Sequence, residues 1–390
     1  MWDFSTDSEF QEKLDWMDKF VTDEVEPLDH LTGQDEHLMY RPVEGAIADI
    51  VRPLQAKVKE HGLWACHLGP ELGGQGYGQV KLALINEILG RTAWGPIVFG
   101  CQAPDTGNAE ILAMFGTDEQ KQRYLQPLLA GELFSAFSMT EPQGGADPRM
   151  FRTKAVQDGE DWIINGEKYF TSNARNAAFL IIMAVTEPDA SPRESMSMFL
   201  VPTETPGIER VRDTGMIGDP PGVGIHPHMR YTDVRVGPDA LLGERGKGFF
   251  IAQARLAGGR LHHAMRTVGL IKRAFGMQCE RALSRNTFHG VLADNRSSRR
   301  ASPTRGSRSN NSGCWCCTLR GRSIRMDIAR QWNTYRPARS RWPAWRMTSS
   351  NDHCICTARW VLPTRRRSRG YGRWCRPSLL WTGPRRCTRT

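Results

Sequence analysis

Long apolar runs and cysteines are scarce in the first three quarters of this 390-residue chain. No apolar run of about 18 residues or more occurs, which excludes an evident membrane-spanning helix. The acidic, amphipathic start MWDFSTDSEFQEKLDWMDKF has neither the basic first residues nor the apolar core of a signal peptide. Before residue 296 the chain has three cysteines, Cys66, Cys101 and Cys279, too few for a disulfide framework. We therefore expect a cytoplasmic protein with reduced thiols.

The last 95 residues lack a different set of residue types. Residues 296–390 contain no Lys and no Glu. They have 23 Arg but only two acidic residues, Asp327 and Asp352. This stretch carries a formal charge of +21, so residues 1–295 carry −11 within the chain's total of +10. Seven of the ten Cys and seven of the twelve Trp also lie after residue 295. Such a composition is unusual for a packed helical bundle, so the basic pI does not describe the body of the chain.

Two hydrophobic periods divide residues 1–295. Up to about residue 134, apolar residues recur at helical spacing, and Thr117 with Gln120 has the spacing of a capping box. Pro127 is expected to end or kink the helix that this box starts. From 135 to 245, short β-branched and aromatic runs alternate with turns, and from 246 the helical period returns. Strands are expected at 161–164, 179–185, 196–201 and 229–236, with turns at Asp158-Gly159, Asn165-Gly166, Pro206-Gly207 and Gly237-Pro238.

These patterns predict an α+β protein with the order helices, sheet, helices. We expect an N-terminal helical domain at 1–134, a central β-barrel domain at 135–245 and the start of a C-terminal helical domain at 246–295. The segment 296–390 is expected not to fold natively.

Five strings between residues 70 and 269 resemble the acyl-CoA dehydrogenase family in order and spacing. They are PELGGQGYG (70–78), FGTDEQKQRYLQPLLAGE (115–132), MTEPQGGADP (139–148), INGEKYFTSN (164–173) and GRLHHAMRTVG (259–269). A sixth, APDTGNAEIL (103–112), looks closest to the family's longer-chain branch. The resemblance implies FAD-dependent α,β-dehydrogenation of acyl-CoA thioesters. It also implies an acyl-CoA substrate, an electron-transferring flavoprotein as partner and a homodimer or homotetramer.

The resemblance places the flavin ring against two segments of the expected barrel, which would give it flat apolar cover and a few fixed hydrogen bonds. Thr140 can bond the polar rim of the ring. The family more often has Trp at the position of Phe170, and either segment alone is equally compatible with an ordinary barrel strand. The residues implied in cofactor binding are Phe137, Ser138, Met139, Thr140, Phe170 and Ser172.

Further matches concern phosphates and substrate, which need fixed cations or donors. Arg260 matches the family's helix-start Arg near the acyl-CoA site, and Ala146 stands where many members have a substrate-contacting Ser. The string SRNTFHG matches a motif that reaches the FAD pyrophosphate of a neighbouring subunit, through Arg285, Thr287 and Phe288. A homo-oligomer is therefore expected.

The family draws its catalytic carboxylate from the C-terminal helical domain, and this chain shows no such residue in frame. The reading frame can be shifted so that each new codon takes the third base of one codon and the first two bases of the next. The shifted codons then permit sequences that look like the family's C-terminal helices. The permitted strings are LVQERIADSWIE over 297–308, HGALGVSN over 357–364 and DGPTEVH over 382–388. We infer one lost base at codon 296.

Two shifted positions are nearly forced by the genetic code. Trp381 followed by Thr382 gives GAC, which encodes Asp, and Trp360 followed by Val361 gives GGT, which encodes Gly. Thr382 thus stands where the catalytic base is expected, and its hydroxyl cannot take up a proton at neutral pH. The chain as written is expected to be a poor enzyme.

Other readings stay open at this point. An acyl-CoA oxidase or a flavin monooxygenase of the same fold would share these motifs. Two further readings accept the tail as it is written. The chain would then be a non-catalytic remnant, or a protein that binds nucleic acid through its Arg-rich tail. We expect no nucleic-acid partner, because a genuine basic arm would not encode motifs of this family when its codons are shifted by one base. We expect no metal site, because the tail cysteines lack the two CxxC pairs of usual zinc sites and the adjacent His262 and His263 diverge on a helix.

Overall fold

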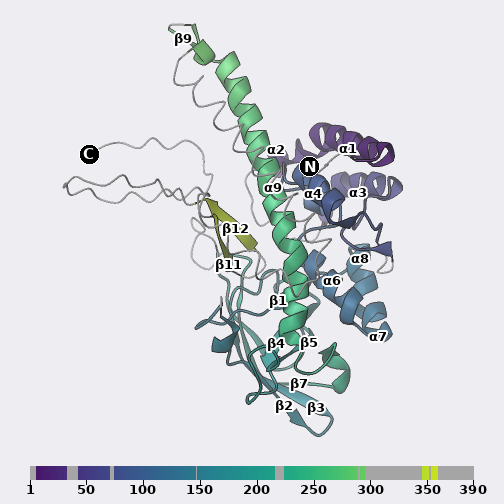
Figure 1. Cartoon of the computed structure of the whole chain (residues 1–390), viewed down its shortest axis with the longest axis vertical. Coiled ribbons are helices and arrows are strands. Elements are labelled where there is room, and N and C mark those ends of the chain that lie inside the picture. Colours follow the sequence, from purple (N-terminus) through teal and green to yellow (C-terminus); the bar gives the residue numbers. More distant parts are fainter. Residues whose placement is uncertain are drawn as a thin grey trace, which may run out of the picture.

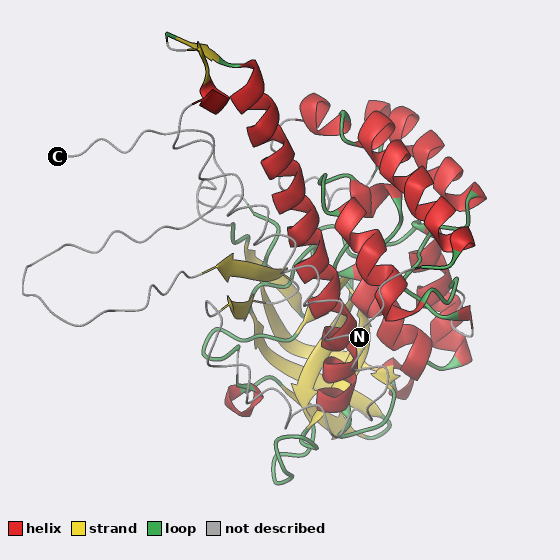
Figure 2. Cartoon of the chain, turned by 45° about the horizontal axis from the view of Figure 1, so that its top comes forward, coloured by secondary structure: helices red, strands yellow, loops and turns green. Residues whose placement is uncertain are grey.

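The computed structural model describes residues 6–32, 43–70, 74–145, 147–215, 224–288, 290–294, 345–350 and 353–358. Short helices come first, a sheet follows, and the long helix α9 (Gly248–Ser284) runs along both (Figure 1). The short helices gather on one side and the sheet lies below and beside α9 (Figure 2). The predicted α+β order is confirmed as far as α9. Of the C-terminal helical domain predicted to start at residue 246, the described residues contain α9 as their one α-helix.

The helices up to residue 101 share one apolar core, which includes Phe10, Met17, Val51, Ile85 and Phe99, whereas those at 105–130 pack in a second core with the sheet and α9. α1 begins where the side chain of Asp7 accepts the N–H of Phe10 at 2.9 Å. The elements are α1 (Ser8–Phe20), η1 (Val21–Val25), α2 (Leu28–Thr32), α3 (Gly45–Glu60), α4 (Gly78–Leu89), α5 (Gly95–Val98), α6 (Asp105–Phe115), α7 (Asp118–Gln120), η4 (Lys121–Leu125) and α8 (Gln126–Ala130).

The predicted capping box is confirmed. Thr117 Oγ1 accepts from the N–H of Gln120 at 3.2 Å, and Gln120 Oε1 accepts from the N–H of Thr117 at 3.1 Å. Pro127 does not end the helix, because the widened π-turn η4 precedes it and places it in the first turn of α8. The helix ends at Ala130, where Gly131 takes a left-handed conformation with φ of 79°.

Eight strands form a sheet in the order β6-β7-β3-β2-β4-β5-β8, with β1 beside β4. Their bounds are β1 (Ser135–Ser138), β2 (Lys154–Asp158), β3 (Asp161–Lys168), β4 (Phe179–Val185), β5 (Met196–Pro202), β6 (Ile208–Arg212), β7 (His228–Val236) and β8 (Leu241–Leu242). The predicted barrel is a curled sheet around its own core, and within the described chain its end strands β6 and β8 do not pair with each other.

β4 explains how the sheet separates two cores. Phe179, Ile181 and Met183 pack toward the helices, whereas Leu180 and Ile182 pack into the core that the sheet surrounds. Because neither face meets water, the strand is a continuous apolar run and pairs in parallel with β1.

One predicted turn is wrong. Asn165-Gly166 does not reverse the chain but lies inside β3, where the pairing with β7 shifts register. Gly166 has φ of +147°, and a Cβ there would lie 2.5 Å from Thr153 Oγ1, so glycine serves a β-bulge rather than a hairpin. The predicted turn at Asp158-Gly159 does join β2 to β3, with Gly159 at φ of 67°.

Past α9 the chain forms β9 (Asn286–Thr287), paired with β10 (Gly290–Val291), and the turn η7 (Leu292–Asp294). Within 296–390 the structure describes two antiparallel strands, β11 (Trp345–Ser350) and β12 (His353–Ala358). Two short 3-10 turns, η5 (Pro148–Met150) and η6 (Pro238–Ala240), complete the described elements.

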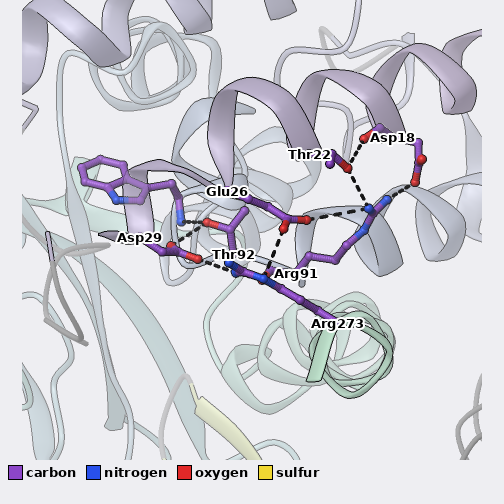
Figure 3. Close-up of polar contacts among 8 residues, drawn as sticks. Asp18, Thr22, Glu26, Asp29, Arg91, Thr92 and Arg273 are labelled. Carbon is purple, nitrogen blue, oxygen red and sulfur yellow. Dashed lines mark hydrogen bonds and ion pairs between the residues drawn. The ribbon is translucent and has the colours of Figure 1, made fainter. Parts of the chain in front are cut away.

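A polar network fastens α9 to the N-terminal helices (Figure 3). Arg273 Nε lies 3.2 Å from Glu26 Oε2, and Arg273 Nη1 donates to Asp29 Oδ2 at 2.5 Å and to the carbonyl of Arg91 at 2.6 Å. Thr92 Oγ1 donates to the same Asp29 carboxylate at 2.7 Å. Burial raises the pKa of Glu26, against the pull of Arg273 and Arg91. Arg273 thus joins three N-terminal segments to one point on α9.

Replacing Arg273 with Met is expected to lower the free energy of unfolding by about 1–3 kcal/mol, because Glu26 and Asp29 would keep their half-buried carboxylates without that cation. The neighbouring Lys272→Met removes an exposed ion pair with Glu87 and should change stability by less than about 1 kcal/mol. Urea unfolding followed by circular dichroism measures both. Equal losses for the two variants would contradict the network's role.

Candidate functional site

The structure lays the two segments predicted to hold a flavin side by side. The carbonyl of Thr140 accepts from the N–H of Tyr169 at 2.8 Å, and the carbonyl of Met139 accepts from Lys168 Nζ at 2.8 Å. These segments are far apart in sequence, on either side of β2 and β3. The end of β1 and the segment after β3 therefore form one surface.

A buried ion pair locks the two segments together. Lys168 Nζ lies 2.8 Å from Glu141 Oε1, with the two side chains 0% and 1% exposed. Glu141 also accepts from the backbone N–H of Arg152 at 2.6 Å and of Thr153 at 3.0 Å. Burial lowers the pKa of Lys168 to about 8, against the attraction of Glu141. Burial alone would raise the pKa of Glu141, but Lys168 and the backbone donors hold it below its usual value.

The segment after β3 has an unusual backbone. Phe170 and Asn173 both take positive φ, at 60° and 66°, which residues other than glycine rarely adopt. Backbone bonds hold this shape: the N–H of Asn173 donates to the carbonyl of Ile225, and the N–H of Ser172 to that of Phe170. The Phe170 ring stays half-buried beside the Tyr169 ring, with centroids 4.0 Å apart. Such conformations cluster at functional sites.

Two predicted hydroxyls already have partners. Ser172 Oγ lies 2.7 Å from His226 Nδ1, and Ser138 Oγ lies 3.0 Å from Thr171 Oγ1 and 2.6 Å from the Tyr231 hydroxyl. Ser138 is therefore occupied within the sheet's core. Ser172, which is 0% exposed, also donates from Oγ to the carbonyl of Phe170 at 3.5 Å.

Phe137 points away from this surface. Its ring is 1% exposed and lies beneath the Arg255 guanidinium of α9, 4.0 Å from the ring centroid. Arg255 Nε also donates to Asn108 Oδ1 of α6 at 2.8 Å. Phe137 thus joins β1 to α6 and α9, rather than offering its side chain to a ligand beside Thr140.

Sequence reasoning missed the buried polar group that holds the start of β1. Asp105 Oδ1 accepts from Ser135 N–H at 2.8 Å and from Ser135 Oγ at 2.5 Å, while Asn108 Nδ2 donates to Ser135 Oγ at 2.8 Å. Burial raises the pKa of Asp105 to about 7, although Ser135, Gln102 and Arg255 favour its charged form. The string APDTGNAEIL carried this signal, because Asp and Asn three residues apart share one face of a helix.

Replacing Asp105 with Asn is expected to change how stability depends on pH. The pKa of Asp105 is higher in the folded chain than in the unfolded one, so its stabilising effect is complete below about pH 4 and is lost as pH rises through about 7. Relative to Asp105→Asn, the unaltered chain should lose about 2–3 kcal/mol between about pH 5 and pH 8. Urea unfolding at both pH values measures this difference. The exposed Asp189→Asn should leave it unchanged, and parallel behaviour of Asp105→Asn would contradict the assignment.

The other predicted residues lie elsewhere. Arg260 is exposed on α9. Arg285, Thr287 and Phe288 lie at or beyond the end of α9, away from β1 (Figure 1), and the Phe288 side chain is 97% exposed. The structure does not bring these four residues to the paired segments of the same chain. Ala146 and Thr382 lie outside the described residues.

The paired segments fit a flavin. They hold a half-buried aromatic ring at Phe170, a buried hydroxyl at Ser172 and a close approach at Gly145, where a Cβ would lie 3.0 Å from Thr140 Cγ2. A flat ring system needs this combination of an aromatic wall, a few donors and close backbone. Phe137 and Ser138 support the surface from behind.

The described residues contain neither a candidate metal centre nor a membrane-spanning helix. No three His, Cys, Asp or Glu side chains gather there in a way that could bind a metal ion. Within the same residues, every helix is too short or too polar to cross a bilayer.

Comparison with known proteins agrees with the predicted family. Residues 8–132 match the N-terminal domain model of acyl-CoA dehydrogenase, and residues 136–224 match its middle domain model. The chain is 42% identical over 260 residues to the probable acyl-CoA dehydrogenase FadE2 of Mycobacterium tuberculosis, covering 65% of this chain and 62% of that protein. It is 40% identical over 248 residues to mouse acyl-CoA dehydrogenase family member 11, covering 62% of this chain and 32% of that protein.

The match thus spans less than two thirds of the length of these relatives. A solved structure described as an acyl-CoA dehydrogenase from Mycobacterium abscessus superposes with a TM-score of 0.72 and 33% identity, covering 80% of this chain and 79% of that one. The chain belongs to the acyl-CoA dehydrogenase family, whose cofactor is FAD.

Proposed function

We propose that the in-frame protein oxidises acyl-CoA thioesters between the α and β carbons. FAD held at the paired segments would supply the acceptor for the hydride of the β carbon. The observation that carries the proposal is the pairing of the two flavin segments, fastened by Lys168 and Glu141. Family membership supports it, and the domain division at 134/135 and 245/246 is part of the proposal.

Each residue of the paired segments has a role in this proposal. Phe170 covers one face of the flavin ring, while Thr140 and Ser172 bond its polar edge. Met139 adds apolar contact and Ser138 holds the strand in place. Arg285, Thr287 and Phe288 would serve the flavin of a neighbouring subunit, because they lie beyond the far end of α9 from the paired segments. Arg260 and Ala146 are proposed to contact the acyl-CoA.

The proton chemistry requires a carboxylate that this reading frame does not supply. We propose that an Asp belongs at position 382, where Thr382 now stands, and that one lost base at codon 296 accounts for residues 296–390. The chain as written then binds FAD incompletely and turns over slowly.

The environment of the protein follows from the same proposal. An electron-transferring flavoprotein would reoxidise the flavin, the assembly would be a homodimer or homotetramer, and the location cytoplasmic, in fatty acid metabolism. An acyl-CoA oxidase is the second candidate, distinguished by direct reaction of the reduced protein with oxygen.

Flavin binding tests the site. Phe170→Ala is expected to weaken FAD binding by about 1 kcal/mol, roughly fivefold, because the aromatic wall is lost. Phe250→Ala removes a ring of α9 that is 54% exposed and should leave affinity unchanged. Fluorescence quenching of FAD titrated with each protein gives both affinities. If Phe170→Ala binds as tightly as Phe250→Ala, the proposed ring contact is wrong.

A further inference from the structure

Cys66 and Cys101 lie next to each other in the helical layer, although 34 residues separate them in sequence. Their side chains are 1% and 2% exposed. The backbone bond from the N–H of Ala65 to the carbonyl of Phe99, at 3.1 Å, aligns the two segments, and each thiol is the largest influence on the pKa of the other. The flavin site uses neither cysteine.

Arg266 of α9 makes the pair asymmetric. Its Nη2 donates to the carbonyl of Cys101 at 2.7 Å and lies 3.7 Å from Cys101 Sγ. The Cys66 thiol and Arg266 hold the pKa of Cys101 below its usual value, against the effect of burial. The neighbouring Cys101 thiol and burial raise the pKa of Cys66 well above its usual value. Ionisation is therefore favoured at Cys101 over Cys66.

A cavity of about 500 Å³ is lined by sequence neighbours of both cysteines. Trp64, His67, Gly100 and Gln102, which flank the two cysteines in sequence, all line it. Burial and the nearby Arg266 lower the pKa of His67 to about 3, so its ring is neutral. Within the described part of the chain, neither ring nitrogen has a hydrogen-bond partner. The neutral His67 ring can donate one hydrogen bond to a molecule in this cavity and accept another from it.

We propose that Cys66 and Cys101 form a dithiol site that peroxide converts to an intramolecular disulfide. The Cys101 thiolate attacks one peroxide oxygen and the O–O bond breaks, which leaves a sulfenic acid on Cys101 and hydroxide. Hydroxide takes the Cys66 proton, and the Cys66 thiolate attacks the Cys101 sulfur, forming the S–S bond and releasing a second hydroxide. That hydroxide takes the proton that Cys101 lost on ionising. The two thiols lose two electrons, and one peroxide becomes two waters.

Peptide mapping of the whole 390-residue chain tests the site. Protein treated with hydrogen peroxide is unfolded in iodoacetamide and digested with trypsin, which puts Cys66 in fragment 60–81 and Cys101 in fragment 92–121. The expected product is these two fragments joined, two hydrogens lighter than their sum and separated by dithiothreitol. It should form about tenfold faster than Cys279 is oxidised, because thiolate reacts and thiol does not.

Single substitutions separate this pair from general oxidation. Cys66→Ser should abolish the joined fragments and leave a sulfenic acid on Cys101 that dimedone traps. Cys279→Ser should leave the yield unchanged. The proposal is overturned if Cys66 and Cys101 both stay alkylatable while Cys279 is oxidised, or if Cys101 joins a different cysteine. The test needs no flavin, so its outcome is independent of the proposed dehydrogenase activity.

Discussion

Restoring one base at codon 296 is expected to raise acyl-CoA-dependent dye reduction by about 10²- to 10⁴-fold, the usual contribution of a positioned general base. The repaired frame replaces Thr382 with Asp. It also supplies the helices that would cover the exposed apolar side chains of α9. Exposed apolar side chains such as Leu270 and Met277, at 56% and 50% exposure, promote aggregation when uncovered. Solubility and turnover should therefore return together.

The matched control is Asn at position 382 of the repaired protein. Asn keeps the shape of the side chain but cannot take up the α-proton, so turnover should fall back while flavin stays bound. Steady-state rates, with flavin content measured on the same samples, decide the outcome. If the repaired protein stays insoluble, the frame inference is wrong. If the Asn variant retains its rate, the assignment of the base is wrong.

Replacing Lys168 with Met should lower the free energy of unfolding by about 3–5 kcal/mol, because Glu141 would remain charged and buried without its cation. The double variant Lys168→Met, Glu141→Gln should regain part of this loss, since Gln removes the buried charge and its oxygen can still accept from one of the N–H groups of Arg152 and Thr153. FAD affinity should fall with Lys168→Met, because the carbonyl of Met139 also loses its donor.

Urea unfolding measures these changes, and Lys154→Met on the exposed side of β2 is the control. Its loss should stay below about 0.5 kcal/mol, as for most surface substitutions. Similar losses for Lys154→Met and Lys168→Met, or a double variant no more stable than the single one, would show that the ion pair does not join the two segments.

The local parts of this fold were predictable from sequence. The run at 179–185 is β4 with the bounds predicted, and the capping box at Thr117 forms as predicted, because both depend on neighbouring residues. The turn predicted at Asn165-Gly166 was wrong, because glycine is needed there to avoid a clash with Thr153, which is distant in sequence. A local pattern cannot distinguish a hairpin glycine from a bulge glycine when the contacting strand is unknown.

The candidate site divides in the same way. The two segments around Thr140 and Phe170 came from motif resemblance, and the structure places them side by side. The polar group that holds β1 was not predicted from the sequence. Asp105 bonds Ser135 thirty positions away, and Arg255 bonds Asn108 across 147 positions. Hydrogen bonds of that separation leave no periodic trace in the sequence. Ser138 shows the converse, because its hydroxyl, assigned to the cofactor, bonds Tyr231 instead.

Anaerobic addition of acyl-CoA to the frame-repaired, FAD-loaded protein is the most direct test of acyl-CoA oxidation at the paired segments. Without oxygen or dye, the visible absorbance of the flavin should fall on mixing with a saturated acyl-CoA, and a 2-enoyl-CoA should appear in equal amount. Free CoA should leave the spectrum unchanged. A protein that holds FAD at these segments yet keeps its oxidised spectrum with acyl-CoAs of short, medium and long chain would contradict the proposed function.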